Sequence, residues 1–234
     1  MQHFDARIVS LTPATPSIHV LRLAIDDPAF RFLPGQWIDF SVVLGDAIHT
    51  AGYSITTSPL DHHGIELAIR ASTRHPVARW IHHDARPGDR VRVSQGQGPF
   101  VYLPEMGENL VLIGGGVGVT PLLSIFRHVR DAHLPTRTHL LYSVSEPSEI
   151  LFRDELEAAA SACDNLRVSF TVSQPTPGWS GATGRIDANT LRTLDAPGDT
   201  LYYLCGPPGM VEDMSGLLHE MGVPMSRIIF EKWW

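Results

Sequence analysis

The sequence is poor in cysteine, in long apolar runs and in positive charge. Its only cysteines, Cys163 and Cys205, exclude a disulfide framework and fall short of the roughly four thiolates that hold an iron–sulfur cluster. No apolar run approaches the roughly 20 residues of a membrane-spanning helix. The formal net charge of -7 argues against nucleic acid and anionic membrane as the main partners.

The first residues, MQHFDARIVSLTP, lack the basic and then apolar pattern of a secretory signal. We therefore expect a cytoplasmic protein, or one whose targeting segment has been removed. With 43% hydrophobic and 18% charged residues among 234, the chain suits one large globular domain or two small ones.

The twelve histidines are scattered along the chain and predict no metal site. His62 and His63 are adjacent, as are His82 and His83. Two ligands on one face of a helix need a spacing of about four residues, which neither pair has.

Residues 1–103 have the pattern of a small antiparallel β-barrel. Partly alternating runs predict strands at 7–11, 18–25, 36–44, 64–71 and 89–94, with one helix at 77–85. Turn clusters such as DDP, LPGQ and RPGD separate these runs. Many short strands with a single helix are typical of a small barrel.

Residues 104–234 instead alternate buried strands with helices. The strands are predicted at 110–115, 138–144, 166–173, 200–206 and 227–231, and the helices at 121–131, 149–162, 187–195 and 208–222. Asp187 is expected to cap the third helix. This order predicts a doubly wound, parallel, five-stranded sheet, which binds ligands at the carboxyl ends of its strands.

The glycine-rich stretch IGGGVGVTPLLSIF (113–126) joins the first of these strands to its helix. Glycines let the backbone approach a pyrophosphate, and the helix N-terminus offers free N–H groups and partial positive charge. Pro121 lies where the first turn of a helix accepts it. The spacing is neither G-x-G-x-x-G nor a P-loop, so a simple tight turn remains the alternative to nucleotide binding.

Two further stretches combine small and aromatic residues at strand ends. In YLCGPPGM (203–210), Gly206 clears space and Cys205 is expected at the sheet edge facing the crevice, or else buried as a structural cysteine. In AGYSITTSP (51–59), Tyr53 offers a ring that can lie on a planar group, and Ser54 and Thr56 offer hydroxyls. The alternative to a ligand contact is that this stretch is an ordinary strand with Tyr53 in the barrel wall.

Taken in order, PGQW (34–37), GYSI (52–55), GGGVGVTP (114–121) and LCGPPGM (204–210) resemble the ferredoxin–NADP⁺ reductase superfamily, which pairs a flavin-binding barrel with a nicotinamide-nucleotide domain. More narrowly, HPVARWIH (75–82) and the terminal FEKWW resemble the oxidoreductase NAD-binding domain-containing protein 1 group. The resemblance covers nearly the whole chain and implies a flavin-binding domain at 1–103 and an NAD(P)-binding domain at 104–234.

For the flavin, the resemblance implies that Tyr53 packs on the isoalloxazine and that Ser54 approaches its N5. The superfamily's pyrophosphate arginine falls on Ala51, and the serine of its second phosphate site falls on Ala78. Nearby substitutes are Arg70, Arg74 and Arg79, and the backbone N–H groups at the start of the helix. The implied flavin contacts, with FAD favoured over FMN, are Gln36, Tyr53, Ser54, Ile55, Thr56, Ile69, Arg70, Ala71, Pro76, Val77, Ala78, Trp233 and Trp234.

The chain ends on two adjacent tryptophans. By resemblance, Trp233 and Trp234 stack on the isoalloxazine and the adenine of the flavin, in one order or the other. A cap on the core between the two domains is the alternative. Glu231 falls where a superfamily carboxylate lies near the nicotinamide.

For the nicotinamide nucleotide, the resemblance implies contacts from Gly115, Gly116, Gly118, Thr120, Pro121, Ser143, Ser145, Cys205, Gly206 and Pro207. Ser145 and Gln174 are neutral at positions where many relatives carry a basic residue that can pair with the 2′-phosphate of NADPH. Their neutrality favours NADH. Arg153 and Arg185 leave NADPH possible.

The resemblance thus implies an NAD(P)H-dependent flavoprotein reductase with Ser54, Cys205 and Glu231 at the reacting centre. A hydride passes from NADH to FAD, and the electrons then go to a separate acceptor: a protein, a quinone, free flavin or dioxygen. Two alternatives stay open. One is a reductase that treats flavin as a diffusing substrate, and the other is a nucleotide-binding regulatory module without flavin.

Overall fold

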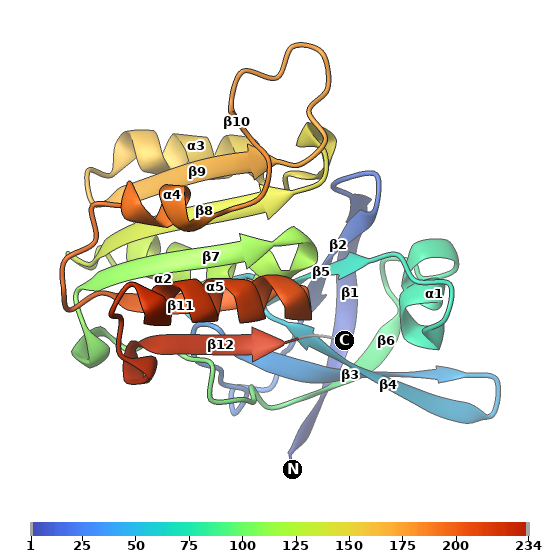
Figure 1. The fold of residues 1–234 in the computed structure, drawn as a ribbon. Coiled ribbons are helices and arrows are strands. Elements are labelled where there is room, and N and C mark those ends of the chain that lie inside the picture. Colours follow the sequence, from blue (N-terminus) through green and yellow to red (C-terminus); the bar gives the residue numbers. More distant parts are fainter. Residues whose placement is uncertain (1, 233–234) are drawn as a thin grey trace.

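The N-terminal half of the molecule, residues 2–103, is an antiparallel sheet that curls on itself (Figure 1). A computed structural model describes residues 2–232. The strands are β1 (His3–Pro13), β2 (Ile18–Ala24), β3 (Trp37–Leu44), β4 (Ala47–Ser54), β5 (Ile65–Arg70) and β6 (Arg90–Ser94), in the order β4-β3-β6-β1-β2-β5. An isolated bridge between Ile55 and Leu67 joins the two edges. The predicted barrel is confirmed as this curled, half-barrel sheet.

Alternating burial shows why these residues form strands around a core. Along β1, Phe4, Ala6 and Ile8 are buried while their neighbours face outward. The predicted helix forms as α1 (Pro76–His83), which turns Val77, Ala78 and Ile81 toward the same core. It begins one residue before the predicted 77 and ends two residues before 85.

One strand of this sheet was not predicted separately. Residues 47–54 form β4, which pairs with β3 over its whole length through a hairpin at Gly45 and Asp46. Gly45 has a φ of 62°, a conformation that glycine adopts without steric cost, so this position makes the tight turn possible.

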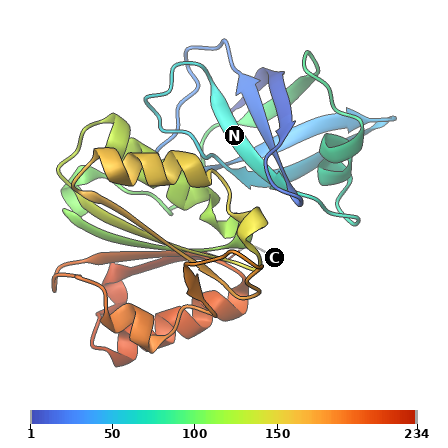
Figure 2. The ribbon, with the colours of Figure 1, turned by 90° about the horizontal axis from the view of Figure 1, so that it is seen from above.

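The C-terminal half, residues 104–232, is a parallel sheet covered by helices. Its strands are β7 (Asn109–Gly115), β8 (Arg137–Val144), β9 (Leu166–Val172), β10 (Ala182–Thr183), β11 (Leu201–Gly206) and β12 (Ile228–Lys232), in the order β10-β9-β8-β7-β11-β12. Its helices are α2 (Thr120–Asp131), α3 (Arg153–Ala162), α4 (Ala188–Arg192) and α5 (Pro208–Glu220). Figure 2 shows α2 and α3 on the face toward the N-terminal sheet, and α4 and α5 on the opposite face. The doubly wound architecture is thereby confirmed.

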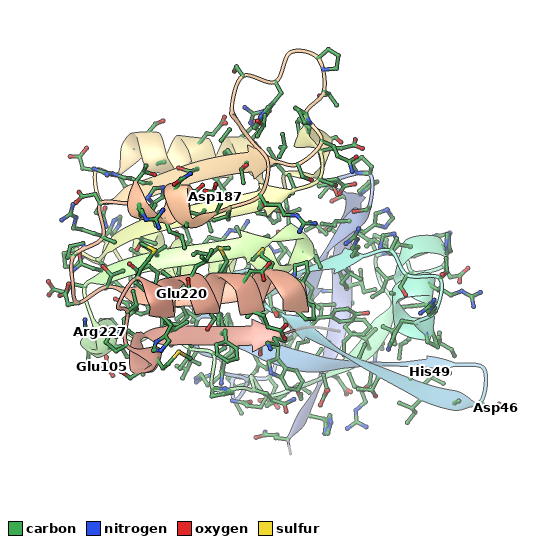
Figure 3. All side chains as sticks on the ribbon, in the orientation of Figure 1. Asp46, His49, Glu105, Asp187, Glu220 and Arg227 are labelled. Carbon is green, nitrogen blue, oxygen red and sulfur yellow. The ribbon has the colours of Figure 1, made fainter. Side chains whose placement is uncertain are left out.

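Three details of this half differ from the sequence prediction. Helix α4 ends at Arg192, three residues before the predicted 195. The sheet has a sixth strand, β10, whose two residues carry too little periodicity to be recognised. Helix α3 begins at Arg153 and not at 149, because a 3-10 turn (Pro147–Glu149) and a left-handed Phe152, with φ of 56°, precede it. Asp187 caps α4 as predicted, since its side chain accepts a hydrogen bond from the Thr190 N–H (Figure 3).

The two halves share an apolar core. Ile18, Val20 and Ala68 of the N-terminal sheet belong to the same buried cluster as Leu122 and Phe126 of α2. The functional division at residue 103 remains a prediction. None of the helices within residues 2–232 is both long and apolar enough to cross a membrane.

Candidate functional site

A cavity of about 440 Å³ lies at the carboxyl ends of the parallel strands, which is where a doubly wound sheet binds ligands. Its lining comes from both halves of the chain: Ser17, Ile18, Arg70, Gly115, Gly116, Val117, Ser143, Val144, Ser145, Glu149, Ser173, Arg185, Ile186, Pro207, Gly209, Met210, Asp213 and Met214. Of the predicted nucleotide contacts, the cavity thus brings together Gly115, Gly116, Ser143, Ser145 and Pro207.

The glycine-rich turn lines this cavity, and it leaves no room for a side chain at Gly115. At Gly115 a Cβ would lie 2.5 Å from the Met210 sulfur. Gly116 has a φ of 54° and open space around it, so its backbone faces the cavity uncovered. The 3-10 turn Gly116–Val119 then leads directly into α2, which puts the N-terminal end of that helix beside the cavity.

Other residues of the motif support this turn without lining the cavity. A Cβ at Gly118 would lie 2.5 Å from the Gly206 Cα, so the two backbones touch. The buried Thr120 hydroxyl donates to the Val117 carbonyl at 2.9 Å, and Pro121 occupies the first turn of α2. Gly118, Gly206, Thr120 and Pro121 therefore shape the turn.

Cys205 is fully buried and packs in the core on the α2 side, as the alternative interpretation of that residue expected. It does not line the cavity. Strand register nevertheless places Cys205 beside Gly114 on one neighbour and Glu231 on the other. Glu231 also approaches the N-terminal half, because a Cβ at Gly98 would lie 3.9 Å from its Oε1.

The predicted flavin segment forms the end of β4 and the turn after it. Tyr53 is half-buried, its ring meets Phe40 edge-on at 6.1 Å between centroids, and burial raises its pKa. Ser54 is 6% exposed. Ile55 is fully buried and bridges to Leu67.

Two predicted flavin contacts have their side chains committed to other protein groups. The Thr56 hydroxyl donates to Glu66 Oε1 at 2.8 Å. The Gln36 amide donates to the Gly98 carbonyl at 3.2 Å, and its Oε1 accepts from the Leu33 N–H at 2.8 Å. These bonds fix the segment before β3, which carries Gln36, and the segment after β4, which carries Thr56.

The remaining predicted flavin residues lie between β5 and α1. Arg70 lines the main cavity. The Ile69 carbonyl lies 2.9 Å from His82 Nε2, and the Ala71 N–H donates to the Ser17 carbonyl. Pro76, Val77 and Ala78 begin α1, and no side chain caps this helix start.

A second cavity, of about 340 Å³, opens beside α1. It is lined by Ala71, Ser72, Thr73, Arg79, His82 and His83. Of the three arginines named as phosphate partners, Arg70 lines the first cavity and Arg79 the second, whereas Arg74 lines neither.

Charged groups in the main cavity bear on the choice of nucleotide. Arg185 and Glu149 line it, whereas Arg153 pairs with Glu157 on α3 and lies over the ring of Trp179. The Glu149 carboxylate accepts hydrogen bonds from the Thr15 and Ser17 hydroxyls of the N-terminal half, at 2.9 and 2.6 Å. Gln174 does not line the cavity.

Glu149 and Ser17 were missed by the sequence reasoning. They lie 132 positions apart, and neither belongs to a motif, so only the folded chain brings them together. Trp233 and Trp234 lie outside the described residues. Within residues 2–232, no three or more His, Cys, Asp or Glu side chains are grouped so as to hold a metal ion.

Comparisons with known proteins agree with this geometry. Residues 112–216 match the family model described as oxidoreductase NAD-binding domain. A zebrafish (Danio rerio) protein named oxidoreductase NAD-binding domain-containing protein 1 is 38% identical over 255 residues, covering 100% of this chain and 93% of its own. Ferredoxin–NADP reductase B of Sorangium cellulosum is 30% identical, covering 98% of this chain and 97% of its own.

Among solved structures, the flavohem-like FAD/NAD binding domain of nitric oxide dioxygenase from Vibrio cholerae superimposes with a TM-score of 0.87 at 20% identity. The match covers 98% of each chain. A ferredoxin NADP⁺ reductase from Neisseria gonorrhoeae superimposes with a TM-score of 0.85 at 22% identity over 100% of both chains, so the fold is that of the ferredoxin reductases.

Proposed function

Because the chain belongs to the oxidoreductase NAD-binding domain-containing protein 1 family, a group of ferredoxin reductase-like NAD-binding oxidoreductases, we propose that it is a flavin-dependent reductase that uses NADH. The observation that carries this proposal is the cavity at the strand ends, because it joins an open glycine turn of one half to Arg70 of the other. The acceptor of the electrons is a separate molecule: a protein, a quinone, free flavin or dioxygen.

The nicotinamide nucleotide fits the residues that are present. Gly116 leaves its backbone open to the cavity, and α2 directs the partial positive charge of its N-terminus to the same place. The pyrophosphate is expected on Gly115 and Gly116, with the nicotinamide toward Pro207. The adenosine is expected toward Ser143 and Ser145, where the cavity continues past β8.

Flavin fits the N-terminal half less completely. Tyr53 offers a half-buried ring, and Ser54 stands next to it at the strand end. The phosphates would be met by the uncapped start of α1 together with Arg79 or Arg70, in place of the arginine and serine that are Ala51 and Ala78 here. Bound FAD supplies the capacity to accept a hydride from NADH and to release electrons one at a time. The relative from Vibrio cholerae is described as an FAD/NAD binding domain, which supports the assignment.

The protein's own part in this reaction is binding, orientation and exclusion of water. The glycine turn fixes the nucleotide on the C-terminal half, while the end of β4 fixes the flavin on the N-terminal half. Ser54 is proposed to donate a hydrogen bond near the reacting nitrogen, and Glu231 is proposed to border the nicotinamide from β12, with Cys205 buried beside it on β11.

An absorbance spectrum of the purified protein, taken before and after anaerobic addition of NADH, tests the proposal. Bound oxidised flavin absorbs at about 450 nm, and this band should bleach on reduction. Protein that shows no such band, and gains none on addition of FAD, would contradict flavin dependence and leave a nucleotide-binding module.

A second function is favoured by one observation, the alanines at positions 51 and 78. With fewer phosphate contacts, flavin would be held more loosely and would act as a diffusing substrate. Gel filtration separates the two functions, because a flavin substrate would leave the protein during the run while a resident cofactor would elute with it.

A further inference from the structure

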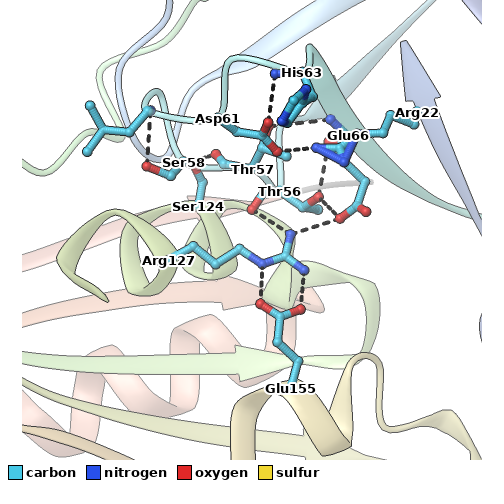
Figure 4. A network of polar contacts seen from close by, with 11 residues as sticks. Arg22, Thr56, Thr57, Ser58, Asp61, His63, Glu66, Ser124, Arg127 and Glu155 are labelled. Carbon is cyan, nitrogen blue, oxygen red and sulfur yellow. Dashed lines mark hydrogen bonds and ion pairs between the residues drawn. The ribbon is translucent and has the colours of Figure 1, made fainter. Parts of the chain in front are cut away.

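A buried polar seam joins α2 to the N-terminal half, next to the apolar contact between them. Figure 4 shows its centre, where Arg127 reaches from α2 to both halves of the molecule. One turn earlier on the same helix face, the Ser124 hydroxyl donates to the Thr57 carbonyl at 2.7 Å. Thr56 and Thr57 follow directly after Tyr53, Ser54 and Ile55 in the chain.

Arg127 makes hydrogen bonds in two directions. Toward the N-terminal half, Nη1 donates to the Thr56 carbonyl at 3.0 Å and to Glu66 Oε1 at 2.8 Å. Toward α3, Nε and Nη2 donate to the two carboxylate oxygens of Glu155 at 2.8 and 2.5 Å. The Phe152 ring lies under the guanidinium at 4.4 Å.

The carboxylates of the seam keep the Arg127 guanidinium charged. The Arg127 side chain is 8% exposed, and burial by itself would lower its pKa, but Glu155 and Glu66 raise that pKa by more. The Glu66 carboxylate also accepts from the Thr56 hydroxyl. Arg130 donates to Glu155 as well, at 2.8 Å. The guanidinium therefore stays charged and has directional partners on both sides.

Such a network is weak evidence for stability, because buried ion pairs can often be replaced by apolar residues at no cost. Its role here is to fix the position of α2 relative to the N-terminal half. The apolar contacts of Ile18, Val20 and Ala68 with α2 can slide, whereas a planar guanidinium with four bonded oxygens cannot.

The position of the seam links the two predicted binding segments. Helix α2 begins at the end of the glycine turn, and Ser124 lies only four residues along it, or about 6 Å of helix rise. On the other side, Thr56 lies two residues after Ser54. A shift of the seam would therefore change the distance between the nucleotide turn and the flavin strand.

We infer that Arg127 is a positioning residue that locks α2 against the Thr56–Thr57 segment, and so fixes the spacing of the two halves for hydride transfer. Only the effect on hydride transfer rests on the proposed function. The fixed spacing of the two halves does not require bound flavin.

The test compares two variants that remove the same bonds. Arg127→Met takes the guanidinium away from the half-buried Glu66 carboxylate and leaves Glu155 paired with Arg130 alone, so it should be destabilised. The triple variant Glu66→Gln, Arg127→Met and Glu155→Gln removes all three charges, and its Tm should fall by less. Arg137→Gln serves as a control, since it breaks an exposed ion pair with Asp195 inside the C-terminal half.

The first readout uses protein without flavin. Spin labels at Arg92 on β6 and at Glu220, the exposed end of α5 (Figure 3), report the distance between the halves, in a background where Cys163 is serine. The distance distribution should be narrow in the parent and in Arg137→Gln, and broader or shifted in the triple variant. An unchanged distribution in the triple variant would overturn the inference.

The second readout is the limiting rate of flavin reduction by NADH in stopped flow. A loss of alignment should slow the triple variant about tenfold or more, with nucleotide affinity changed less than about threefold. Equal rates would again overturn the inference. Should the parent itself not be reduced, the proposed function fails, while the distance measurement still decides the role of Arg127. If the triple variant does not fold, Ser124→Ala combined with Arg127→Lys replaces it and carries the same expectations, since lysine keeps the positive charge but lacks the planar fork of donors.

Discussion

Ser54 stands at the last position of β4, 6% exposed, between a half-buried tyrosine and a fully buried isoleucine. Its backbone is fixed by pairing with Trp37 on β3. A side chain on so constrained a backbone can hold one hydroxyl at one place, as a positioned hydrogen bond requires.

Ser54→Ala should therefore slow flavin reduction by NADH and leave flavin occupancy nearly unchanged. Loss of one positioned hydrogen bond corresponds to roughly 1–3 kcal/mol of barrier, or about 5- to 150-fold in rate. Stopped-flow reduction measures the effect. Ser41→Ala on β3 is the control, because its hydroxyl meets only Thr50 across the hairpin. Equal rates in Ser54→Ala and the parent would exclude the assigned role.

The preference for NADH or NADPH also depends on a few individual side chains. Ser145 is neutral and Glu149 is anionic, and both line the cavity, although Arg185 lines it too. Because Glu149 is held in place by Thr15 and Ser17, its charge should disfavour a 2′-phosphate nearby.

We expect kcat/KM to favour NADH, and expect Glu149→Gln to raise kcat/KM for NADPH more than for NADH. Steady-state kinetics with both nucleotides measure this preference. An initial preference for NADPH would identify Arg185 as the dominant group, and Arg185→Gln would then be expected to reverse it.

At the scale of elements, the close approach of the glycine turn to β11 is the most demanding contact of the site. A Cβ at Gly118 would meet the Gly206 Cα and N and the Cys205 carbonyl, all within 2.7 Å and all backbone. Backbone atoms cannot turn away as a flexible side chain can, so the turn and the strand would have to separate.

Gly118→Ala should lower the free energy of unfolding by about 1–3 kcal/mol and weaken binding of NAD⁺ by tenfold or more. Thermal unfolding and calorimetric titration measure the two effects. Gly216→Ala in α5 is the matched control: a Cβ there meets nothing within 4 Å, so alanine should be neutral or stabilising. Similar losses in both variants would show that the contact with Gly206 is unimportant.

For the whole molecule, half-buried histidines tie stability to pH. Burial lowers the pKa of His19, His128 and His139 from the ordinary value of 6.5. For His19 the stacked ring of His82, 4.0 Å away, and His83 lower the pKa further. Between the folded pKa and 6.5 the unfolded chain binds more protons, so stability is fully present above about pH 6.5 and is lost as pH falls through the folded pKa.

The Tm should thus fall between about pH 7.5 and about pH 5.5, and His19→Phe, which keeps a ring against His82, should flatten part of this dependence. Calorimetry at several pH values measures the slopes. His62→Gln, at an exposed position, should leave the slope unchanged. A slope in His19→Phe as steep as in the parent would mean that the His19–His82 pair does not contribute.

Much of the fold was predictable because it depends on local periodicity. Alternation along β1 and the continuous apolar run of β7 each predict their environment without knowledge of the partner strand. The strand β10 and the late start of α3 were not predictable, since two residues carry no period and the left-handed Phe152 leaves no sequence signal.

The candidate site divides in the same way. By itself, the sequence determined the glycine turn, the strand ends that carry Tyr53 and Pro207, and the order of the two halves, because these are contiguous motifs with local backbone requirements. Only the tertiary structure decided which side chains meet: Glu149 with Ser17, Arg127 with Glu66 and Thr56, and the retreat of Cys205 into the core. Those pairings follow from the packing of α2 and the 3-10 turn before α3 against the curled sheet, and packing between distant segments leaves no pattern in a single sequence.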